Sequence, residues 1–169
     1  TDSQIPEKRR IEKISVKRKL NLSLILNETK GIKLNSHEFA NEKQVLKLKF
    51  KNKIFKLEVD LIGKVQIKNV LMAILAAYKS GIKIEKIINV IAKLKSVEGR
   101  FEKIGKIRNN SKVILDYAHT PAALELVLLN LKEQFPNNKI SLVFGCGGER
   151  DLRKRSLMGS IANKHADKI

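Results

Sequence analysis

The feature that most constrains the fold lies between residues 113 and 165, where apolar runs alternate with stretches of helical spacing. Residues 113–115 are a continuous apolar run, which is typical of a buried strand in a parallel sheet, and residues 140–144 predict a second buried strand. Between them, leucines recur at helical spacing as far as Phe135, and residues 157–165 predict a second helix. This order predicts an α/β fold with a parallel sheet, which residues 166–169 extend into a third strand.

The first part of the chain has a different pattern, dominated by alternating apolar and charged residues. Alternation predicts strands over residues 20–26, 45–51 and 54–59. The last two strands flank Asn52 and Lys53, a short polar connection that favours a β-hairpin.

Helical spacing follows the hairpin. Apolar residues recur at that spacing over residues 67–79 and 84–94, and Gly81 is expected to end the first of these helices. We therefore expect a hairpin packed beside a helical pair in residues 1–98. A second domain is expected in residues 99–169, because the pattern restarts after Gly99 and Arg100.

Charge is the strongest compositional signal, with 35 Lys and Arg residues against 17 Asp and Glu and a net charge of +18. Such a balance raises the possibility of nucleic-acid binding. The basic residues are nevertheless spread along the chain, and two Tyr and six Phe with no Trp offer few rings for base stacking. We predict a solvated lysine surface without a specific nucleic-acid partner. A basic nucleic-acid-binding module remains the alternative from another functional class.

Several classes of protein are disfavoured. Cys146 is the only cysteine, which excludes an intrachain disulfide, and with only three His a zinc site is not expected. No apolar stretch approaches membrane length, and the first residues have no signal-peptide pattern. We expect a cytoplasmic protein without membrane insertion.

Polar side chains follow the first apolar run, where ligands gather in open α/β sheets. Asp116, Tyr117 and His119 precede Thr120, an expected helix N-cap, and Pro121, suited to the first helical position. A carboxylate here can hold ribose hydroxyls, and a helix N-terminus favours an anion. The structural alternative is that Asp116 caps the turn, Tyr117 packs and His119 is solvated, and the residues alone leave both open.

The second apolar run is followed by a glycine-rich loop over residues 145–150. Glycines allow close approach of a ligand to the backbone. The basic side chains in and after the loop can hold a carboxylate or phosphate, and they are Arg150, Arg153, Lys154 and Arg155. The alternative is a plain strand-to-helix turn with a solvated charge run. Arg100, at the expected domain boundary, is either a surface residue or a hinge arginine that reaches a phosphate.

Four segments resemble motifs of the ATP-dependent Mur ligases, in the family order. They are residues 61–69 (L-x-G-x-[FY]-[NQ]-x-x-N, with Val65 at the aromatic position), 99–102 (G-R-[MF]-E), 116–121 (D-Y-A-H-T-P) and 144–151 (F-G-C-G-G-[DE]-R-D). The resemblance implies that residues 1–98 form the C-terminal half of a central ATP-binding domain. It implies that residues 99–169 form the N-terminal part of a Rossmann-like, amino-acid-binding C-terminal domain.

The resemblance also implies a reaction in peptidoglycan synthesis. The most similar members add a third residue, usually meso-diaminopimelate, to UDP-N-acetylmuramoyl-L-alanyl-D-glutamate. ATP phosphorylates the substrate carboxylate, the amine of the amino acid attacks the acyl phosphate, and Mg2+ stabilises the phosphoryl charge. A lysine-adding Mur ligase and a folylpolyglutamate synthase are the alternatives within the superfamily.

Site residues follow from the same resemblance. The ATP-binding positions are Asn69 near the adenine, Arg100 at the phosphates, Asp116 at the ribose, and His119. Tyr117 and Arg150 match positions near the incoming amino acid. The family's P-loop, modified lysine and metal-binding residues belong upstream, so we expect no catalytic residue or metal ligand here. The expectation is a fragment, inactive alone, of a ligase that is monomeric when complete.

Overall fold

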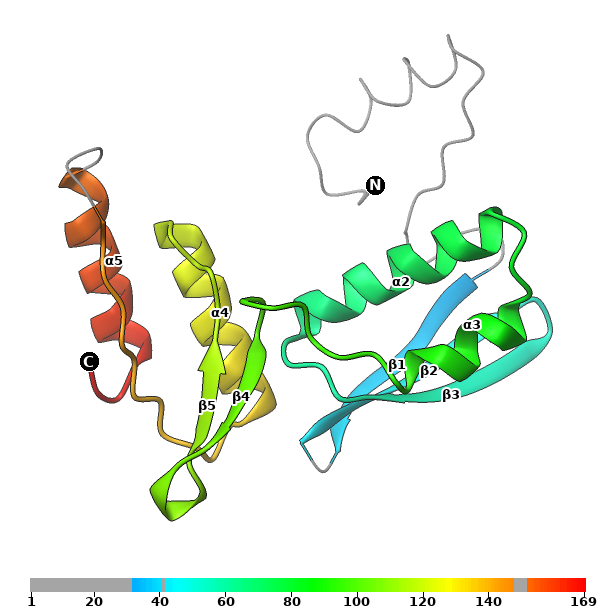
Figure 1. The fold of residues 1–169 in the computed structure, drawn as a ribbon, viewed down its shortest axis with the longest axis horizontal. Coiled ribbons are helices and arrows are strands. Elements are labelled where there is room, and N and C mark those ends of the chain that lie inside the picture. The colour runs from blue at the N-terminus through cyan, green and yellow to red at the C-terminus, as the bar shows by residue number, and fades with distance from the viewer. Residues whose placement is uncertain (1–31, 41, 148–151) are drawn as a thin grey trace, which may run out of the picture. The chain divides into compact units, whose positions relative to one another are not determined.

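The structure is a computed structural model that describes residues 32–40, 42–147 and 152–169 (Figure 1). The expected strand over residues 20–26 lies outside these ranges. In chain order the elements are β1 (Ile32–Ala40), β2 (Lys43–Phe50), β3 (Lys53–Val59), α2 (Lys64–Lys79), α3 (Ile84–Ile91), β4 (Glu102–Lys106), a 3-10 turn (Arg108–Asn110), β5 (Lys112–Leu115), α4 (Pro121–Gln134) and α5 (Leu152–His165).

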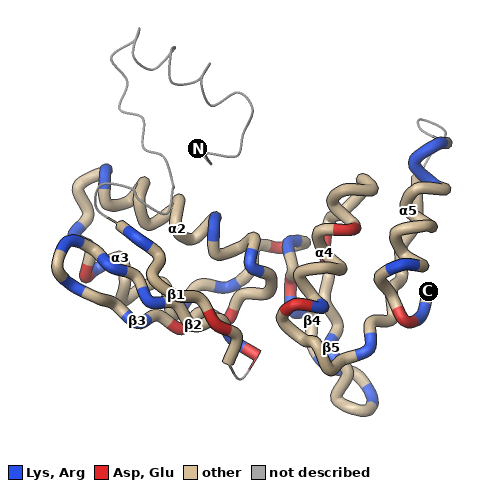
Figure 2. Tube along the Cα trace, turned by 180° about the vertical axis from the view of Figure 1, so that it is seen from behind, with Lys and Arg blue, Asp and Glu red and all other residues tan. Residues whose placement is uncertain are grey.

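The strands β1, β2 and β3 form an antiparallel sheet with β2 in the centre. The predicted hairpin is confirmed, because β2 and β3 pair from Phe50 opposite Lys53 to Gln44 opposite Val59. Strand β1 was missed from the sequence, and a bulge after Leu34 interrupts its alternation. Lysines alternate with buried residues along β2, so the exposed positions of this strand are basic (Figure 2 marks the lysines in blue).

The predicted helical pair is also confirmed. Helix α2 begins at Lys64, and its buried face consists of Ile67, Val70, Leu71, Ile74 and Leu75. Gly81 ends this helix as predicted, with φ of +90°. Its N–H donates to Tyr78 O (3.0 Å), and Ile82 N–H donates to Ala77 O (3.2 Å), which is the Schellman arrangement. Helix α3 ends at Ile91, earlier than predicted, and Leu94 is 37% exposed.

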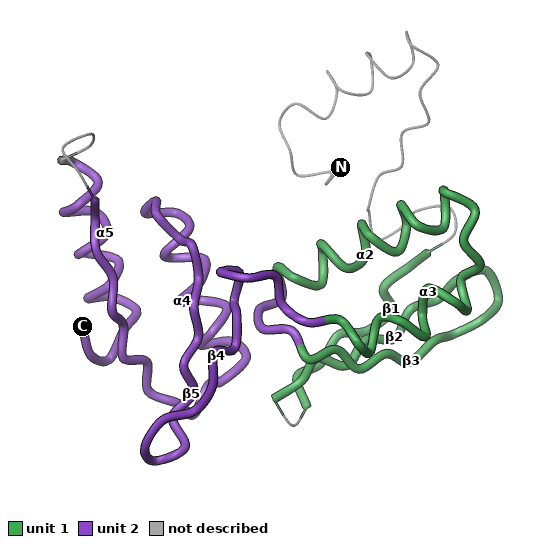
Figure 3. Tube along the Cα trace, in the orientation of Figure 1, with its two compact units in different colours: residues 1–60, 65–94 green, residues 61–64, 95–169 purple. Residues whose placement is uncertain are grey.

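The chain divides into two compact units (Figure 3). The first unit holds the described residues as far as Asp60 together with Val65–Leu94, and thus β1, β2, β3, α2 and α3 except for the start of α2. The second unit holds Leu61–Lys64 and Lys95–Ile169, with β4, β5, α4 and α5. The short segment Leu61–Lys64 therefore packs with residues that follow it by more than thirty positions in the chain.

In the second unit, β4 and β5 form an antiparallel hairpin with a bulge between Lys103 and Gly105. Helix α4 begins as predicted: Pro121 is at its start, and Thr120 Oγ1 accepts a hydrogen bond from Ala123 N–H (3.3 Å). Helices α4 and α5 pack through the buried side chains of Leu124, Leu128 and Met158. The mixed α/β fold class is confirmed.

Two details of the second unit differ from the prediction. Residues 113–115 lie in β5, which pairs antiparallel with β4 and leaves Leu115 49% exposed. In residues 140–144 the described chain forms one parallel bridge, between Ser141 and Lys168, and Val143 is 98% exposed. Alternate residues of this run pack against the α4–α5 core while Val143 does not. This largely apolar segment is therefore buried on one face and exposed on the other.

Candidate functional site

The turn that leads into β4 has an unusual backbone. Gly99 has φ of +65°, and Phe101 has φ of +47° although it carries a side chain. The Phe101 side chain is buried (4% exposed), and its Cζ atom lies 3.2 Å from the point where a Cβ on Gly63 would stand. Arg100 is exposed between these two residues, and its N–H donates to Val97 O (2.9 Å).

Asp116 follows β5 directly, and its carboxylate is hydrogen-bonded to this turn. Its Oδ2 atom accepts a hydrogen bond from Phe101 N–H (2.9 Å), and its Oδ1 atom accepts one from Ala118 N–H (2.9 Å). Tyr117 N–H donates to Gly99 O (2.8 Å) on the same turn. Asp116 therefore caps the turn, as the structural alternative predicted. A carboxylate has about four lone-pair positions, so two remain for a ligand.

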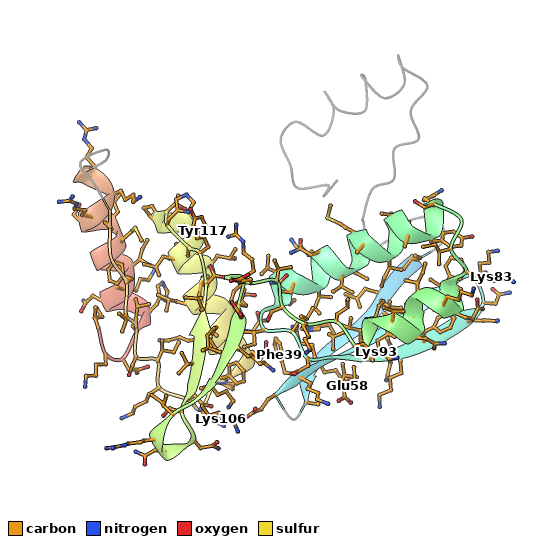
Figure 4. The ribbon with its side chains drawn as sticks, in the orientation of Figure 1. Phe39, Glu58, Lys83, Lys93, Lys106 and Tyr117 are labelled. Carbon is orange, nitrogen blue, oxygen red and sulfur yellow. The ribbon has the colours of Figure 1, made fainter. Side chains whose placement is uncertain are left out.

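Arg100, Tyr117 and His119 form an exposed group that we call the Tyr117 cluster. The Arg100 guanidinium carbon lies 5.2 Å from the centroid of the Tyr117 ring, within the range of a cation–π contact. The rings of Tyr117 and His119 meet edge to face at 5.2 Å, and His119 Nδ1 lies 3.2 Å from Tyr117 O. Tyr117 is 64% exposed and lies beside the start of α4 (Figure 4).

The position of the cluster favours an anionic ligand. The cluster lies where β5 gives way to the N-terminus of α4, a helix of 14 residues whose first amide groups carry partial positive charge. Arg100 adds a full positive charge and a forked set of donors that suits a phosphate or carboxylate. Three of the predicted site residues are thus brought together, with Asp116 as the anchor beneath them.

Asn69 lies on α2, in the first unit. Its side chain is exposed, and Nδ2 donates to Gln66 Oε1 one helical turn earlier (3.1 Å). Both residues belong to a single motif of the sequence and share one face of this helix. The assignment of Asn69 to an adenine site remains a prediction.

The glycine-rich loop is described as far as Gly147, so the predicted Arg150 lies outside the described residues. Arg153, Lys154 and Arg155 stand in the first turns of α5. Cys146 is partly buried, with Sγ 3.5 Å from the Sδ atom of Met158. This thiol packs against the α4–α5 core.

Three polar residues with a part in the site were missed from the sequence. Glu102 Oε2 accepts a hydrogen bond from Gly99 N–H (2.7 Å). On α4, Gln134 is buried and accepts from Gly63 N–H (2.8 Å), and Asn130 lies against Gly63. Glu102 stood within a quoted motif, and Gln134 falls on the buried face of α4, where an amide signals a specific backbone partner.

The described ranges offer neither a cluster of metal ligands nor a membrane-spanning helix. Within them, no three His, Cys, Asp or Glu side chains are grouped so that they could hold a metal ion. In the same ranges, no helix combines the length and the apolar character needed to cross a bilayer.

Residues 99–169, which include the Tyr117 cluster, match the family described as Mur ligase, glutamate ligase domain. Over 121 residues the chain is 43% identical to the UDP-N-acetylmuramoyl-L-alanyl-D-glutamate--2,6-diaminopimelate ligase of Rickettsia prowazekii (strain Madrid E). This alignment covers 71% of the chain and 24% of the relative. The chain therefore spans about a quarter of the length of this relative.

Two solved structures are also similar to the chain. A structure of UDP-N-acetylmuramoyl-L-alanyl-D-glutamate--2,6-diaminopimelate ligase matches 98% of the chain with a TM-score of 0.68 and 26% identity, over 34% of its own length. The FPGS-AMPPCP-folate complex matches 100% of the chain with a TM-score of 0.77 at 17% identity, over 40% of its own length. At that identity the second match shows a likeness of fold.

Proposed function

Since the chain belongs to the Mur ligase family, we propose that the protein carrying it is an ATP-dependent ligase of peptidoglycan synthesis. It adds meso-diaminopimelate to UDP-N-acetylmuramoyl-L-alanyl-D-glutamate, the reaction in the name of the relative that is 43% identical. Residues 1–98 then belong to its central ATP-binding domain, and residues 99–169 belong to its C-terminal, amino-acid-binding domain. The protein acts in the cytoplasm as a monomer.

The proposed reaction has two steps. A carboxylate oxygen of the UDP-linked dipeptide attacks the γ-phosphorus of ATP, which gives an acyl phosphate and ADP. The amine of diaminopimelate then attacks the acyl carbon, an amide forms, and inorganic phosphate leaves with the electron pair of the broken C–O bond. Both steps leave negative charge on a phosphoryl oxygen of the leaving group, ADP in the first step and phosphate in the second, so positively charged groups held in place beside those oxygens lower the barriers.

The observation that carries the proposal is the Tyr117 cluster within the domain that matches the family. A guanidinium, a phenol ring and an imidazole meet at the end of β5 beside the N-terminus of α4. In this proposal Arg100 contacts the phosphates of ATP, and His119 lies near them. Tyr117 contacts the incoming amino acid, together with Arg150.

Asp116 is assigned to the ribose of ATP. Each of its oxygens already accepts one backbone hydrogen bond, which fixes the orientation of the carboxylate and leaves lone pairs that can receive two ribose hydroxyls. Asn69 is assigned to the adenine. Mg2+ is expected from the family, but the described residues offer no cluster of three acidic, His or Cys side chains. No step is therefore assigned to a metal held by them.

The proposal is tested with the complete product of the gene that encodes this chain. Purified protein is incubated with ATP, Mg2+, UDP-N-acetylmuramoyl-L-alanyl-D-glutamate and meso-diaminopimelate, and the tripeptide product and ADP are quantified by mass spectrometry. We expect one ADP per amide formed, and parallel reactions contain L-lysine, or folate with glutamate. If product forms only with lysine, or only with folate and glutamate, the proposed substrates are wrong. If no substrate set releases ADP, the proposal is overturned.

Arginine variants test the site within that assay. Arg100→Ala is expected to raise the KM for ATP or lower kcat by roughly tenfold to a hundredfold, the usual range for a lost phosphate contact. Arg108→Ala is the matched control, because Arg108 is an exposed arginine of the same unit in the 3-10 turn after β4. Equal kinetics for the two variants would contradict the assignment of Arg100 to the ATP phosphates. The 169-residue chain alone is expected to form no product.

A further inference from the structure

We infer that Glu102 is a positioning residue for Arg100 and acts through the backbone of Gly99. The inference deepens the proposed function, because it rests on the assignment of Arg100 to the phosphates of ATP. Glu102 is the first residue of β4 and is partly buried, and its carboxylate turns back onto the turn that carries Arg100.

The turn needs such an anchor because its backbone is strained. Both neighbours of Arg100 have left-handed φ values, +65° at Gly99 and +47° at Phe101. Glycine accepts this region readily, but a phenylalanine adopts it only where the surroundings hold it there. Without its anchors the turn is expected to relax, and Arg100 would move with it.

Three hydrogen bonds hold the two residues on either side of Arg100. Gly99 N–H donates to Glu102 Oε2 (2.7 Å), and Gly99 O accepts from Tyr117 N–H (2.8 Å). Phe101 N–H donates to Asp116 Oδ2 (2.9 Å). A carboxylate acceptor makes the first and third of these bonds stronger than neutral ones. Asp116 and Tyr117 also have proposed ligand contacts, so Glu102 is the anchor that can be removed without removing such a contact.

Positioning has a direct effect on how tightly a phosphate is held. Arg100 is exposed and has a long side chain, so its ordering on binding costs conformational entropy. A fixed turn and the Tyr117 ring, 5.2 Å from the guanidinium carbon, limit the orientations available before ATP arrives. Preorganisation of this kind improves affinity without adding a contact to the ligand.

The experiment is a double-mutant cycle in the complete gene product. Glu102→Ala is expected to raise the KM for ATP roughly tenfold, the scale expected when a contact group is displaced. The KM for the UDP-linked substrate is expected to change less than about twofold. Glu102→Gln keeps an acceptor oxygen for Gly99 N–H and should restore the KM to within about threefold of the wild type. Glu98→Ala, which removes a nearby exposed carboxylate, should match the wild type.

The cycle separates positioning from a general structural role. If Glu102 acts through Arg100, adding Glu102→Ala to the Arg100→Ala variant should change the KM for ATP by less than about twofold. A full tenfold loss in that background would overturn the inference. Equal KM values for Glu102→Ala and the wild type would also overturn it.

A second measurement does not depend on activity. In protein labelled with 15N-arginine, the Nε–Hε order parameter of Arg100 should fall in Glu102→Ala and recover in Glu102→Gln. The order parameter of Arg108 should stay constant in both variants. An unchanged Arg100 order parameter would overturn the inference. Absence of ATP-dependent product in the wild type would instead overturn the proposed function.

Discussion

The two units hold their backbones in place by different means. In the first unit, alternate side chains of β2 and β3 are almost completely buried, with exposures of 6% or less for Leu46, Leu48, Phe50, Leu57 and Val59. The second unit has a smaller buried core around Leu128 and Met158, and it leaves Leu115 and Val143 49% and 98% exposed. Its turns are instead held by side chains that bond the backbone, at Asp116, Glu102 and Gln134.

The two means of support differ in what they can position. The hydrophobic effect is non-directional, so a packed sheet gives stability without orienting polar groups. Hydrogen bonds from side chains to backbone are directional and short in reach, so they fix a turn to within tenths of an ångström. The Tyr117 cluster lies on turns of the second kind, which suits a site that must hold a charged ligand in one orientation.

The largest effect is expected where packing dominates. Leu46 is fully buried on the central strand of the first sheet. The Leu46→Ala variant should therefore lose about 2–5 kcal/mol of unfolding free energy. Ile54→Ala on the neighbouring strand is the control, because Ile54 is 64% exposed and should lose less than about 0.5 kcal/mol. Urea unfolding followed by circular dichroism measures both. Similar losses for the two variants would mean that burial in β2 is not what stabilises this unit.

The next prediction compares one glycine from each unit. Gly63 and Gly81 have similar left-handed φ values, +85° and +90°, so replacement by Ala should cost each about 1–2 kcal/mol in strain. A Cβ on Gly63 would also stand 3.2 Å from both Asn130 Oδ1 and Phe101 Cζ, whereas a Cβ on Gly81 would meet nothing within 4 Å. Gly63→Ala should therefore cost about 1 kcal/mol more than Gly81→Ala in urea unfolding. Equal costs would show that the anchored segment Leu61–Lys64 is loosely held.

The sequence predicted most of what local patterns determine. The β2–β3 hairpin, α2 with its Gly81 end, and the Thr120–Pro121 start of α4 follow from alternation, helical spacing and capping, and the structure has all of them. Strand β1 was missed because a bulge breaks its alternation. The exposure of Val143 was missed because an apolar run does not say what covers each face.

The candidate site was predicted in part. Asp116, Tyr117 and His119 are adjacent in sequence, so their meeting at the end of β5 follows from the strand-to-helix pattern. Their contact with Arg100 could not be derived in that way, because it depends on how β4 pairs with β5. Glu102 stood within a quoted motif and Gln134 on the buried face of α4, but neither position identifies the backbone atom to which the side chain bonds.

Lysine pairs offer a smaller test. In the first sheet Lys47 lies opposite Lys56, and in the second unit Lys106 lies opposite Lys112, whose Nζ lies 5.1 Å from the Phe135 ring. Lys47→Glu should stabilise the chain by about 0.2–1 kcal/mol at low salt, because opposite charges replace like charges across the strands. Lys106→Glu should gain less, because the ring already favours the Lys112 charge.

Lys93→Glu controls for the change in net charge, since this lysine lies outside the strands. Urea unfolding at low and high salt measures all three variants. The gain from Lys47→Glu should shrink in high salt as the charges are screened. If Lys93→Glu gives the same gain, the effect belongs to the net charge of +18 and not to the pairing of β2 with β3.

The smallest expected effect concerns exposed ion pairs of the first unit. The pKa of Glu85 is lowered by a backbone hydrogen bond at the start of α3 and then by Lys53, whose Nζ donates to Glu85 Oε1 (3.2 Å). A lowered carboxyl pKa stabilises the folded state above the ordinary value and loses that contribution as pH falls through the folded value. Lys43 is the opposite case, because its hydrogen bond to Glu58 raises the pKa of Lys43. That contribution is complete below the ordinary lysine value and is lost as pH rises through the raised value.

Both contributions should therefore coexist at neutral pH and fade separately at the two extremes. Glu85→Gln should lose a small part of the unfolding free energy at pH 7, and this loss should shrink as pH falls through the lowered pKa of Glu85. Lys43→Met should show its loss at pH 7 and little loss above the raised lysine pKa. Urea unfolding across pH measures both, and carboxyl NMR titration of Glu85 checks the direction of its pKa. A loss for Glu85→Gln that stays constant as pH falls through the lowered pKa of Glu85 would assign the effect to packing and not to the charge of this carboxylate.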